Sequence, residues 1–135
     1  MSHTSFALCL LAVCLPLHTV QATNDVEILP DVVYGHKLGL ALTMDVFRPA
    51  TNANGAAIVH MASGAWFSKW SPPEGLLSYI QPLTDKGFTV FNVRHGSSPK
   101  FSMAEAIEDV QLSVRFIRLN AERFGIDPNR LGALG

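Results

Sequence analysis

The feature that most constrains the fold is a run of apolar side chains at helical spacing in the last third of the sequence. Steps of four and three residues separate Met103, Ile107, Val110, Val114, Ile117, Ala121 and Phe124. Such spacing places side chains on one face of an α-helix. Ser102 and Glu105 have the spacing of a capping box at its start, and Gly125 ends it. Burying these side chains contributes roughly 10 kcal/mol before entropy is counted, so we expect the helix to lie on a sheet.

Short runs of apolar residues provide strands for that sheet. Residues 56–61 and 88–93 are continuous apolar runs, as expected for buried strands, and a third run begins at Leu131. Two earlier strands, 31–34 and 40–47, are expected to pair antiparallel through a reversal at 35–39. A further helix is predicted to begin with Ser71 as N-cap, to kink or restart at Pro82 and to end at Gly87.

The order of these elements predicts an α/β fold. Crossover helices between buried strands imply a mostly parallel sheet with helices on both faces, and the first two strands form an antiparallel N-terminal pair at one edge. No internal repeat interrupts this order. We therefore expect one domain.

The N-terminal segment predicts export. The first 22 residues contain no Asp, Glu, Lys or Arg, and their apolar stretch, 6–17, is too short to span a bilayer. Val20-Gln21-Ala22 fits a cleavage site, so residues 1–22 are interpreted as a signal peptide and 23–135 as the mature chain, periplasmic or secreted, with no stable membrane insertion after cleavage. A buried N-terminal helix is the alternative, and lipid anchoring through Cys14 a lesser one.

Composition excludes several classes of partner and cofactor. The net charge is −1 and the basic residues are dispersed, so no nucleic acid is expected to bind. Both cysteines, Cys9 and Cys14, lie in the predicted signal peptide, and His36, His60 and His95 show no paired ligand spacing. We therefore expect neither metal nor cofactor. Composition leaves the oligomeric state open.

The loop after residues 56–61 is the first candidate for chemistry. Ser63, Gly64, Ala65 and Trp66 follow a buried strand, and small residues there let backbone amides face the crevice at the strand ends. In an acyl-transfer enzyme such amides form part of an oxyanion hole. An ordinary tight turn with Trp66 as a packing residue explains the same loop equally well.

The end of the chain resembles a known family. Residues 125–132, Gly-Ile-Asp-Pro-Asn-Arg-Leu-Gly, resemble the segment of α/β-hydrolase esterases and lipases that runs into the Gly-x-Ser-x-Gly nucleophile elbow, with Gly135 as its first glycine. The hormone-sensitive-lipase and feruloyl-esterase-like groups are the most similar. Residues 63–66 resemble the end of a His-Gly-Gly-Gly-Trp motif, 101–110 a Phe-Pro-x-Ala-x-Glu-Asp-Val helix start, and 42–49 a Leu-Asp-Val-Tyr-x-Pro strand.

The resemblance implies a function. Residues 23–135 would be the N-terminal part of a serine carboxylic-ester hydrolase, a truncated α/β-hydrolase fold that ends where the elbow starts and acts through an acyl-enzyme on a small-molecule ester. The serine would lie two positions beyond Gly135, so this chain contains no catalytic residue and is expected to be inactive alone. The amides of Gly64 and Ala65 would serve the oxyanion hole. The alternative is a non-catalytic binding protein of the same fold.

The sequence also departs from the family pattern. Aligned on Trp66, the motif histidine falls on Ala62, so His60 is interpreted as a strand residue. His95 occupies the loop that reads Tyr-Arg-Leu-Ala-Pro in relatives, with Arg94 matching the arginine. Ser63, Trp66 and His95 are candidates for the pocket wall. For His95 a supporting position in the loop is the reading that we favour.

Overall fold

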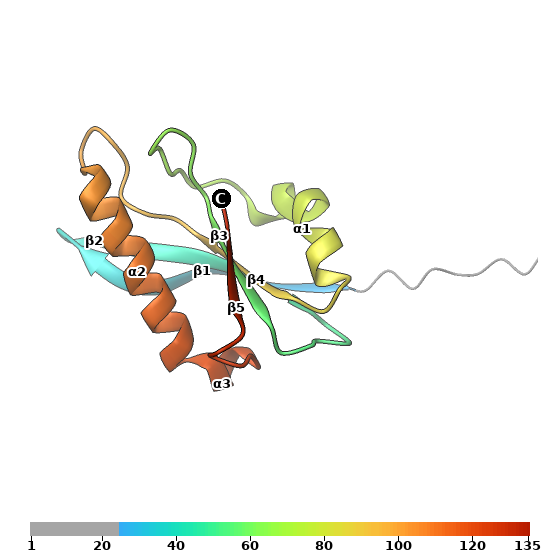
Figure 1. Cartoon of the computed structure of the whole chain (residues 1–135). Helices are drawn as coiled ribbons and strands as arrows, with labels where there is room; N and C mark the ends of the chain where they lie inside the picture. The colour runs from blue at the N-terminus through green and yellow to red at the C-terminus, as the bar shows by residue number, and fades with distance from the viewer. Residues whose placement is uncertain (1–24) are drawn as a thin grey trace, which may run out of the picture.

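A five-stranded sheet organises the molecule. The computed structural model describes residues 25–135, so the predicted signal peptide and its two cysteines lie outside the described residues. The strands lie in the order β1-β2-β4-β3-β5 (Figure 1). The elements are β1 (Val26–Lys37), β2 (Leu40–Pro49), β3 (Ala57–Met61), the 3₁₀ helix η1 (Pro73–Leu76), α1 (Leu77–Thr84), β4 (Thr89–Val93), α2 (Met103–Leu119), α3 (Ala121–Phe124) and β5 (Leu131–Leu134).

Strand directions confirm the predicted fold class. β1 pairs antiparallel with β2, and β2 pairs antiparallel with β4. β3 lies between β4 and β5 and is parallel to both. Because parallel strands end at the same edge of a sheet, the segments that follow β3, β4 and β5 meet there.

The two faces of the sheet carry separate hydrophobic cores. On one face, α2 and α3 cover strand residues such as Val46 and Phe91, and the rings of Phe91 and Phe124 lie 5.0 Å apart edge to face. On the other face, Ile80 of α1 packs with Phe47 and Val90. Neighbouring residues of one strand thus serve opposite cores, as strand geometry requires. Helices on both faces were predicted, and Figure 1 shows them on either side of the sheet.

The first hairpin is longer and tighter than predicted. β1 continues through Lys37, so only Leu38 and Gly39, with φ of 47° and 77°, make the turn. Gly35 therefore lies within the strand instead of in a reversal. A Cβ at Gly35 would come within 2.6 Å of Leu112 Cδ2. The glycine thus leaves room for the Leu112 side chain of α2 to pack against β1.

The predicted start of the second helix was wrong. The 3₁₀ helix η1 begins at Pro73 after Pro72, and Ser71 caps neither η1 nor α1. Pro82 lies inside α1, and Gly87 follows with a φ of 84°. Two consecutive prolines hold the backbone extended before η1, because proline disfavours helical backbone in the residue that precedes it.

The capping box of α2 is confirmed, but its apolar stripe is only partly correct. Ser102 Oγ accepts from the Glu105 amide, and Glu105 accepts from the Ser102 amide, which holds the pKa of the Glu105 carboxyl below its usual value. Ile117 and Phe124 are buried as predicted. Met103 and Ile107, however, are about half exposed.

The buried side of the first half of α2 differs from the prediction by one position. Ala106, Asp109 and Ser113 face inward there. These residues are also spaced by three and four positions, so two sets of residues in this sequence could have formed the buried face of the helix. The contacts of Asp109, described below, select this set. The helix ends at Leu119, and Gly125, with a φ of 66°, caps the short α3 that follows.

Strand β5 forms an edge of the described sheet. It pairs only with β3 among the described strands, and Gly132 and Ala133 are exposed. Unpaired edges of this kind associate with other strands. We predict that residues 23–135, expressed alone, self-associate at micromolar concentration in sedimentation velocity, and that Ala133→Lys reduces this association. Ala104→Lys, at an exposed position of α2, is the matched control and should leave it unchanged; equal effects of both lysines would contradict a role of the edge.

Candidate active site

A cavity of about 420 Å³ lies at the edge where β3, β4 and β5 end. Its wall is built from the loop after β3, the loop after β4, one side of α2 and the residue that follows β5. The lining residues are Met61, Ser63, Ala65, Trp66, His95, Ala106, Ile107, Val110, Gln111 and Gly135. The structure therefore brings together Ser63, Ala65, Trp66, His95 and Gly135, which the sequence placed at a site. Gly64 does not line the cavity.

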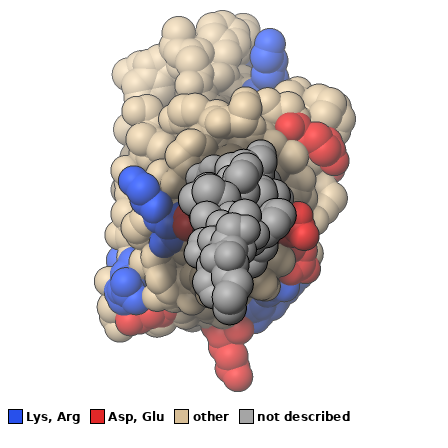
Figure 2. Space-filling view, turned by 90° about the vertical axis from the view of Figure 1, so that its right-hand side faces the viewer, with Lys and Arg blue, Asp and Glu red and all other residues tan. Residues whose placement is uncertain are grey.

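Figure 2 shows how charged side chains are distributed over one face of the molecule. In Figure 2, which views the molecule from the right-hand side of Figure 1, most of the uppermost surface is tan, and one Lys or Arg side chain stands at its upper right. The other Lys, Arg, Asp and Glu side chains in this view lie lower on that face.

The loop after β3 makes a tight turn with two strained residues. Gly64 and Phe67 exchange both backbone hydrogen bonds, each 2.9 Å long. Between them, Ala65 and Trp66 have φ of 51° and 66°, the signs of a type I′ turn, which normally uses Asn or Gly. Residues other than Asn and Gly rarely have a positive φ, and backbone strain of this kind concentrates at functional sites.

This turn separates the two amides proposed for the oxyanion hole. The Gly64 amide donates to the Phe67 carbonyl and is therefore engaged. The Ala65 amide donates to no acceptor among residues 25–135, and Ala65 is one of the residues that line the cavity. Of these two amides, only that of Ala65 is free among residues 25–135. An oxyanion role stays a prediction, and the geometry does not favour Gly64 in it.

The loop after β4 is joined to this turn by serines. Ser97 Oγ accepts from the Ser68 amide at 2.7 Å and donates to the Ser68 carbonyl at 2.5 Å. Ser68 Oγ accepts from the His95 amide at 3.3 Å, and the Ser98 amide donates to the Trp66 carbonyl at 3.2 Å. The two loops thus form one hydrogen-bonded unit, and His95 is placed by it.

Asp109 of α2 anchors the same unit from below, and sequence reasoning missed it. Its carboxylate accepts from the Gly96 amide at 2.9 Å and pairs with Lys37 Nζ at 2.7 Å, and its side chain is almost fully buried. An acidic residue among inward-facing Ala106 and Ser113 was the signal that could have found it. Gly96 permits the approach, since a Cβ there would lie 3.1 Å from Asp109 Oδ2.

Tyr34 supports the start of that loop. Its phenol donates to the Arg94 carbonyl at 2.5 Å. Burial raises the pKa of this phenol far above its usual value; the charge of Asp109 raises it further and Arg94 opposes. The hydroxyl therefore stays protonated and remains a donor at any physiological pH.

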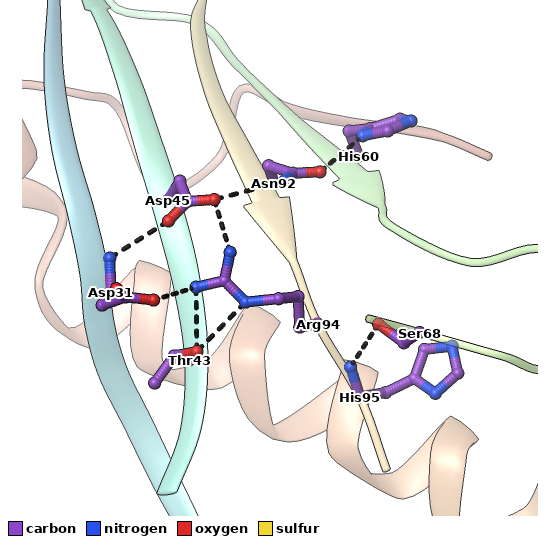
Figure 3. A network of polar contacts seen from close by, with 8 residues as sticks. All are labelled: Asp31, Thr43, Asp45, His60, Ser68, Asn92, Arg94 and His95. Carbon is purple, nitrogen blue, oxygen red and sulfur yellow. Dashed lines mark hydrogen bonds and ion pairs between the residues drawn. The ribbon is translucent and has the colours of Figure 1, made fainter. Parts of the chain in front are cut away.

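The Arg94 side chain extends the support to three strands (Figure 3). It pairs with the fully buried Asp45 at 2.5 Å and with Asp31 at 2.6 Å, and it donates twice to Thr43 Oγ1. Asp45 also accepts from the Asn92 side chain, at 3.4 Å.

His60 ends this network. Its Nδ1 lies 2.8 Å from Asn92 Oδ1, and its ring contacts Tyr79. His60 is a β3 residue, as interpreted from the sequence, and it does not line the cavity.

Neither a metal-binding group of side chains nor a membrane-spanning helix is found in the described part of the chain. Residues 25–135 contain no group of three side chains from His, Cys, Asp and Glu that could hold a metal ion. None of the helices between these limits has the length and apolar character needed to cross a membrane.

Comparisons with known proteins agree with this architecture. The model of the BD-FAE family matches residues 44–135. No curated protein sequence matches the chain. Among solved structures, a truncated form of a carbohydrate esterase from gut microbiota is 27% identical with a TM-score of 0.68, and the match covers 83% of this chain and 40% of that one.

Two other solved structures match over similar ranges. A bifunctional GH43-CE protein of Bacteroides eggerthii is 26% identical with a TM-score of 0.66, covering 78% of this chain and 15% of that one. An arylesterase, 22% identical with a TM-score of 0.65, shares the fold over 79% of this chain and 35% of its own. The chain thus spans less than half the length of each of these structures.

The ion pair of Asp109 and Lys37 predicts a stability effect. Asp109→Leu leaves the Lys37 ammonium without its buried partner, so we expect a loss of about 3 kcal/mol in the free energy of unfolding, measured by urea denaturation of the full-length protein. Glu108→Leu, at the exposed neighbour, should change it by less than about 0.5 kcal/mol. The double variant Lys37→Met/Asp109→Leu should recover part of the loss. If Asp109→Leu matched Glu108→Leu, the pair would not anchor the loop.

Proposed function

The chain belongs to the BD-FAE family, and from this membership we propose that it is the N-terminal part of an esterase that hydrolyses carboxylic esters through a serine acyl-enzyme. One observation carries the proposal. The free Ala65 amide and Gly135, the residue that resembles the first glycine of a nucleophile elbow, line the same cavity. Acyl transfer needs a backbone donor close to a nucleophile, and the expected serine would follow Gly135 in the chain.

The position of Gly135 supports a serine in that cavity. A Cβ on Gly135 would lie 2.7 Å from Met61 Cε, so the chain after β5 passes close to the end of β3. A serine two positions further would lie beside the loop that contains Ala65. Its Oγ would attack the ester carbonyl, and its proton would pass to a histidine base outside this chain and then to the departing alcohol.

The tetrahedral intermediate of the reaction explains why a backbone hydrogen-bond donor is needed. Attack converts the carbonyl oxygen to an oxyanion, which the Ala65 amide and the amide after the serine would stabilise. Collapse releases the alcohol and leaves an acyl-enzyme, which water hydrolyses to the carboxylic acid and free serine. Residues 23–135 alone supply neither the nucleophile nor the base, and we expect this part of the protein to be inactive.

Solved relatives support ester chemistry of this kind. Two of the solved structures named above are esterases, one a carbohydrate esterase and one an arylesterase. Esterase 2 of Thermogutta terrifontis, 19% identical with a TM-score of 0.65, shares the fold over 82% of this chain and 42% of its own, and was solved phosphonylated by cyclosarin. A non-catalytic binding protein remains the rival, and any residue other than serine two positions beyond Gly135 would establish it.

Substitutions in the full-length protein test the oxyanion assignment. Ala65→Gly keeps the amide and suits the positive φ, so turnover should stay within about tenfold of the parent. Ala65→Pro removes the donor and requires a negative φ, so it should lose about 10²- to 10³-fold or more. His60→Ala should stay within about tenfold, because His60 lies outside the cavity.

A covalent complex separates donor loss from turn distortion. In a crystal structure of the full-length protein inhibited by a phosphonate, the phosphoryl oxygen should lie about 3 Å from the Ala65 nitrogen. A folded His60→Ala variant without activity, beside an active Ala65→Pro variant, would instead require realignment of the loop with His60 as the motif histidine.

We also propose that the protein is exported. The support is the uncharged apolar segment 6–17 and the Val20-Gln21-Ala22 site, both in the sequence. In its native host the mature protein should begin at Thr23, as read by mass spectrometry of the intact protein. Mature protein that retains residues 1–22 would contradict the proposal.

A further inference from the structure

The turn that carries Ala65 is joined to the end of β4 and to the loop that follows it. Before the turn, the Ala62 amide donates to the Val93 carbonyl at 2.9 Å, which continues the pairing of β3 with β4. Within the turn, the Trp66 carbonyl accepts from the Ser98 amide at 3.2 Å. The position of the Ala65 amide therefore depends on how firmly this part of the chain holds the turn.

Ser97 joins the loop after β4 to the end of the turn through a single oxygen atom. Its Oγ accepts from the Ser68 amide at 2.7 Å and donates to the Ser68 carbonyl at 2.5 Å. Because a hydroxyl both donates and accepts through one atom, it satisfies both backbone groups of Ser68, as a residue on a neighbouring strand would. The Ser68 hydroxyl also accepts from the His95 amide at 3.3 Å (Figure 3). Ser68 is thus held by three hydrogen bonds to the loop.

The turn needs these bonds because its backbone is strained. Ala65 and Trp66 have φ of 51° and 66°, values that residues other than glycine and asparagine rarely adopt. A strained backbone persists only where surrounding contacts impose it. Without the two bonds of Ser97 we expect the turn to relax toward negative φ, and the Ala65 N–H then points in another direction.

The direction of a backbone donor decides how well it stabilises an oxyanion. The donor has to point beforehand to the place where the charge develops, and a displacement of about 1 Å can cost on the order of 10²-fold in rate. An oxyanion donor acts on the transition state more than on the bound substrate, so its displacement lowers kcat and changes KM little. Ser97 is not among the residues that line the cavity, so its effect on turnover has to pass through the turn.

We propose that Ser97 is a positioning residue, which holds the Ala65 amide in the direction that the oxyanion requires. The proposal rests on the esterase function proposed above and on the oxyanion role of Ala65 within it. Ser97 itself takes no part in acyl transfer. A serine with a merely structural role would change the stability of the protein and leave the kcat of the folded molecules as it is.

Serine substitutions in the full-length protein test this role. With p-nitrophenyl butyrate as substrate and active sites counted by phosphonate titration, Ser97→Ala should lower kcat about tenfold or more and leave KM within about threefold. Ser97→Thr retains the hydroxyl and should recover most of the lost kcat. Ser113→Ala is the matched control, because the Ser113 side chain is buried and its hydroxyl donates to a carbonyl of its own helix. This control should keep kcat within about twofold of the parent.

Glycine at position 65 separates positioning from a general loss of structure. Glycine adopts a positive φ without steric cost, so in the Ala65→Gly variant the turn depends less on Ser97. Ser97→Ala should then lower kcat by less than about threefold when it is added to Ala65→Gly. An equal loss of kcat with alanine and with glycine at position 65 would show that Ser97 does not act through the turn, and would overturn the inference.

Amide hydrogen exchange, followed by NMR, reports on the turn with or without turnover. The Gly64 and Phe67 amides each donate to the other residue's carbonyl across the turn. Ser97→Ala should therefore speed their exchange about tenfold or more, and Ser113→Ala should not. Unchanged exchange in Ser97→Ala would contradict the hold on the turn, and unchanged kcat in a protein that hydrolyses the ester would contradict only the role of Ser97. A parent protein that hydrolyses no ester contradicts the esterase function, and the role of Ser97 in turnover with it.

Discussion

The ion pairs of Arg94 hold together the part of the sheet on which the site is built. The guanidinium joins Asp45 of β2, Asp31 of β1 and Thr43 of β2 to the end of β4. Asp45 is fully buried, so its charge is tolerable only because Arg94, the Asp31 amide and Asn92 all donate to it. Loss of Arg94 would leave that carboxylate without its cation and release the strand that leads into the His95 loop.

From this base the support continues to the cavity through backbone groups. Tyr34 holds the Arg94 carbonyl, Asp109 holds the Gly96 amide, and Ser68 holds the amide between them. Through Ser97 and Ser98 the same loop keeps the strained turn at Ala65 and Trp66 in place. A positive φ at two residues other than glycine persists only where neighbouring contacts impose it. The hydrogen bonds from Ser97 and Ser98 are such contacts. These bonds hold the two loops of the cavity wall in one arrangement.

Much of the fold followed from local patterns, and the misses have physical reasons. The capping box of Ser102 and Glu105 was readable because its partners are three residues apart. In the first half of α2 the predicted buried face was displaced by one residue from the observed one, because hydrophobicity alone favours burial of Ile107 over burial of Asp109. The pairing of Asp109 with Lys37 reverses that preference. Similarly, Gly35 suggested a reversal, whereas its role is to admit Leu112 of α2.

The sequence by itself determined the order of strands and helices along the chain, the helices on both sheet faces and five of the ten residues at the cavity wall. Those properties depend on side-chain periodicity and on the rule that parallel strands end at one edge. Only the tertiary structure decided that the Gly64 amide is engaged, that Asp109 faces inward and that Ser97 joins the loop after β4 to the turn. Each of these depends on hydrogen bonds whose partners are set by folding: Tyr34 meets Arg94 across 60 positions, and Ser68 meets His95 across 27. Periodicity cannot register such contacts, because they exist only once the strands have paired.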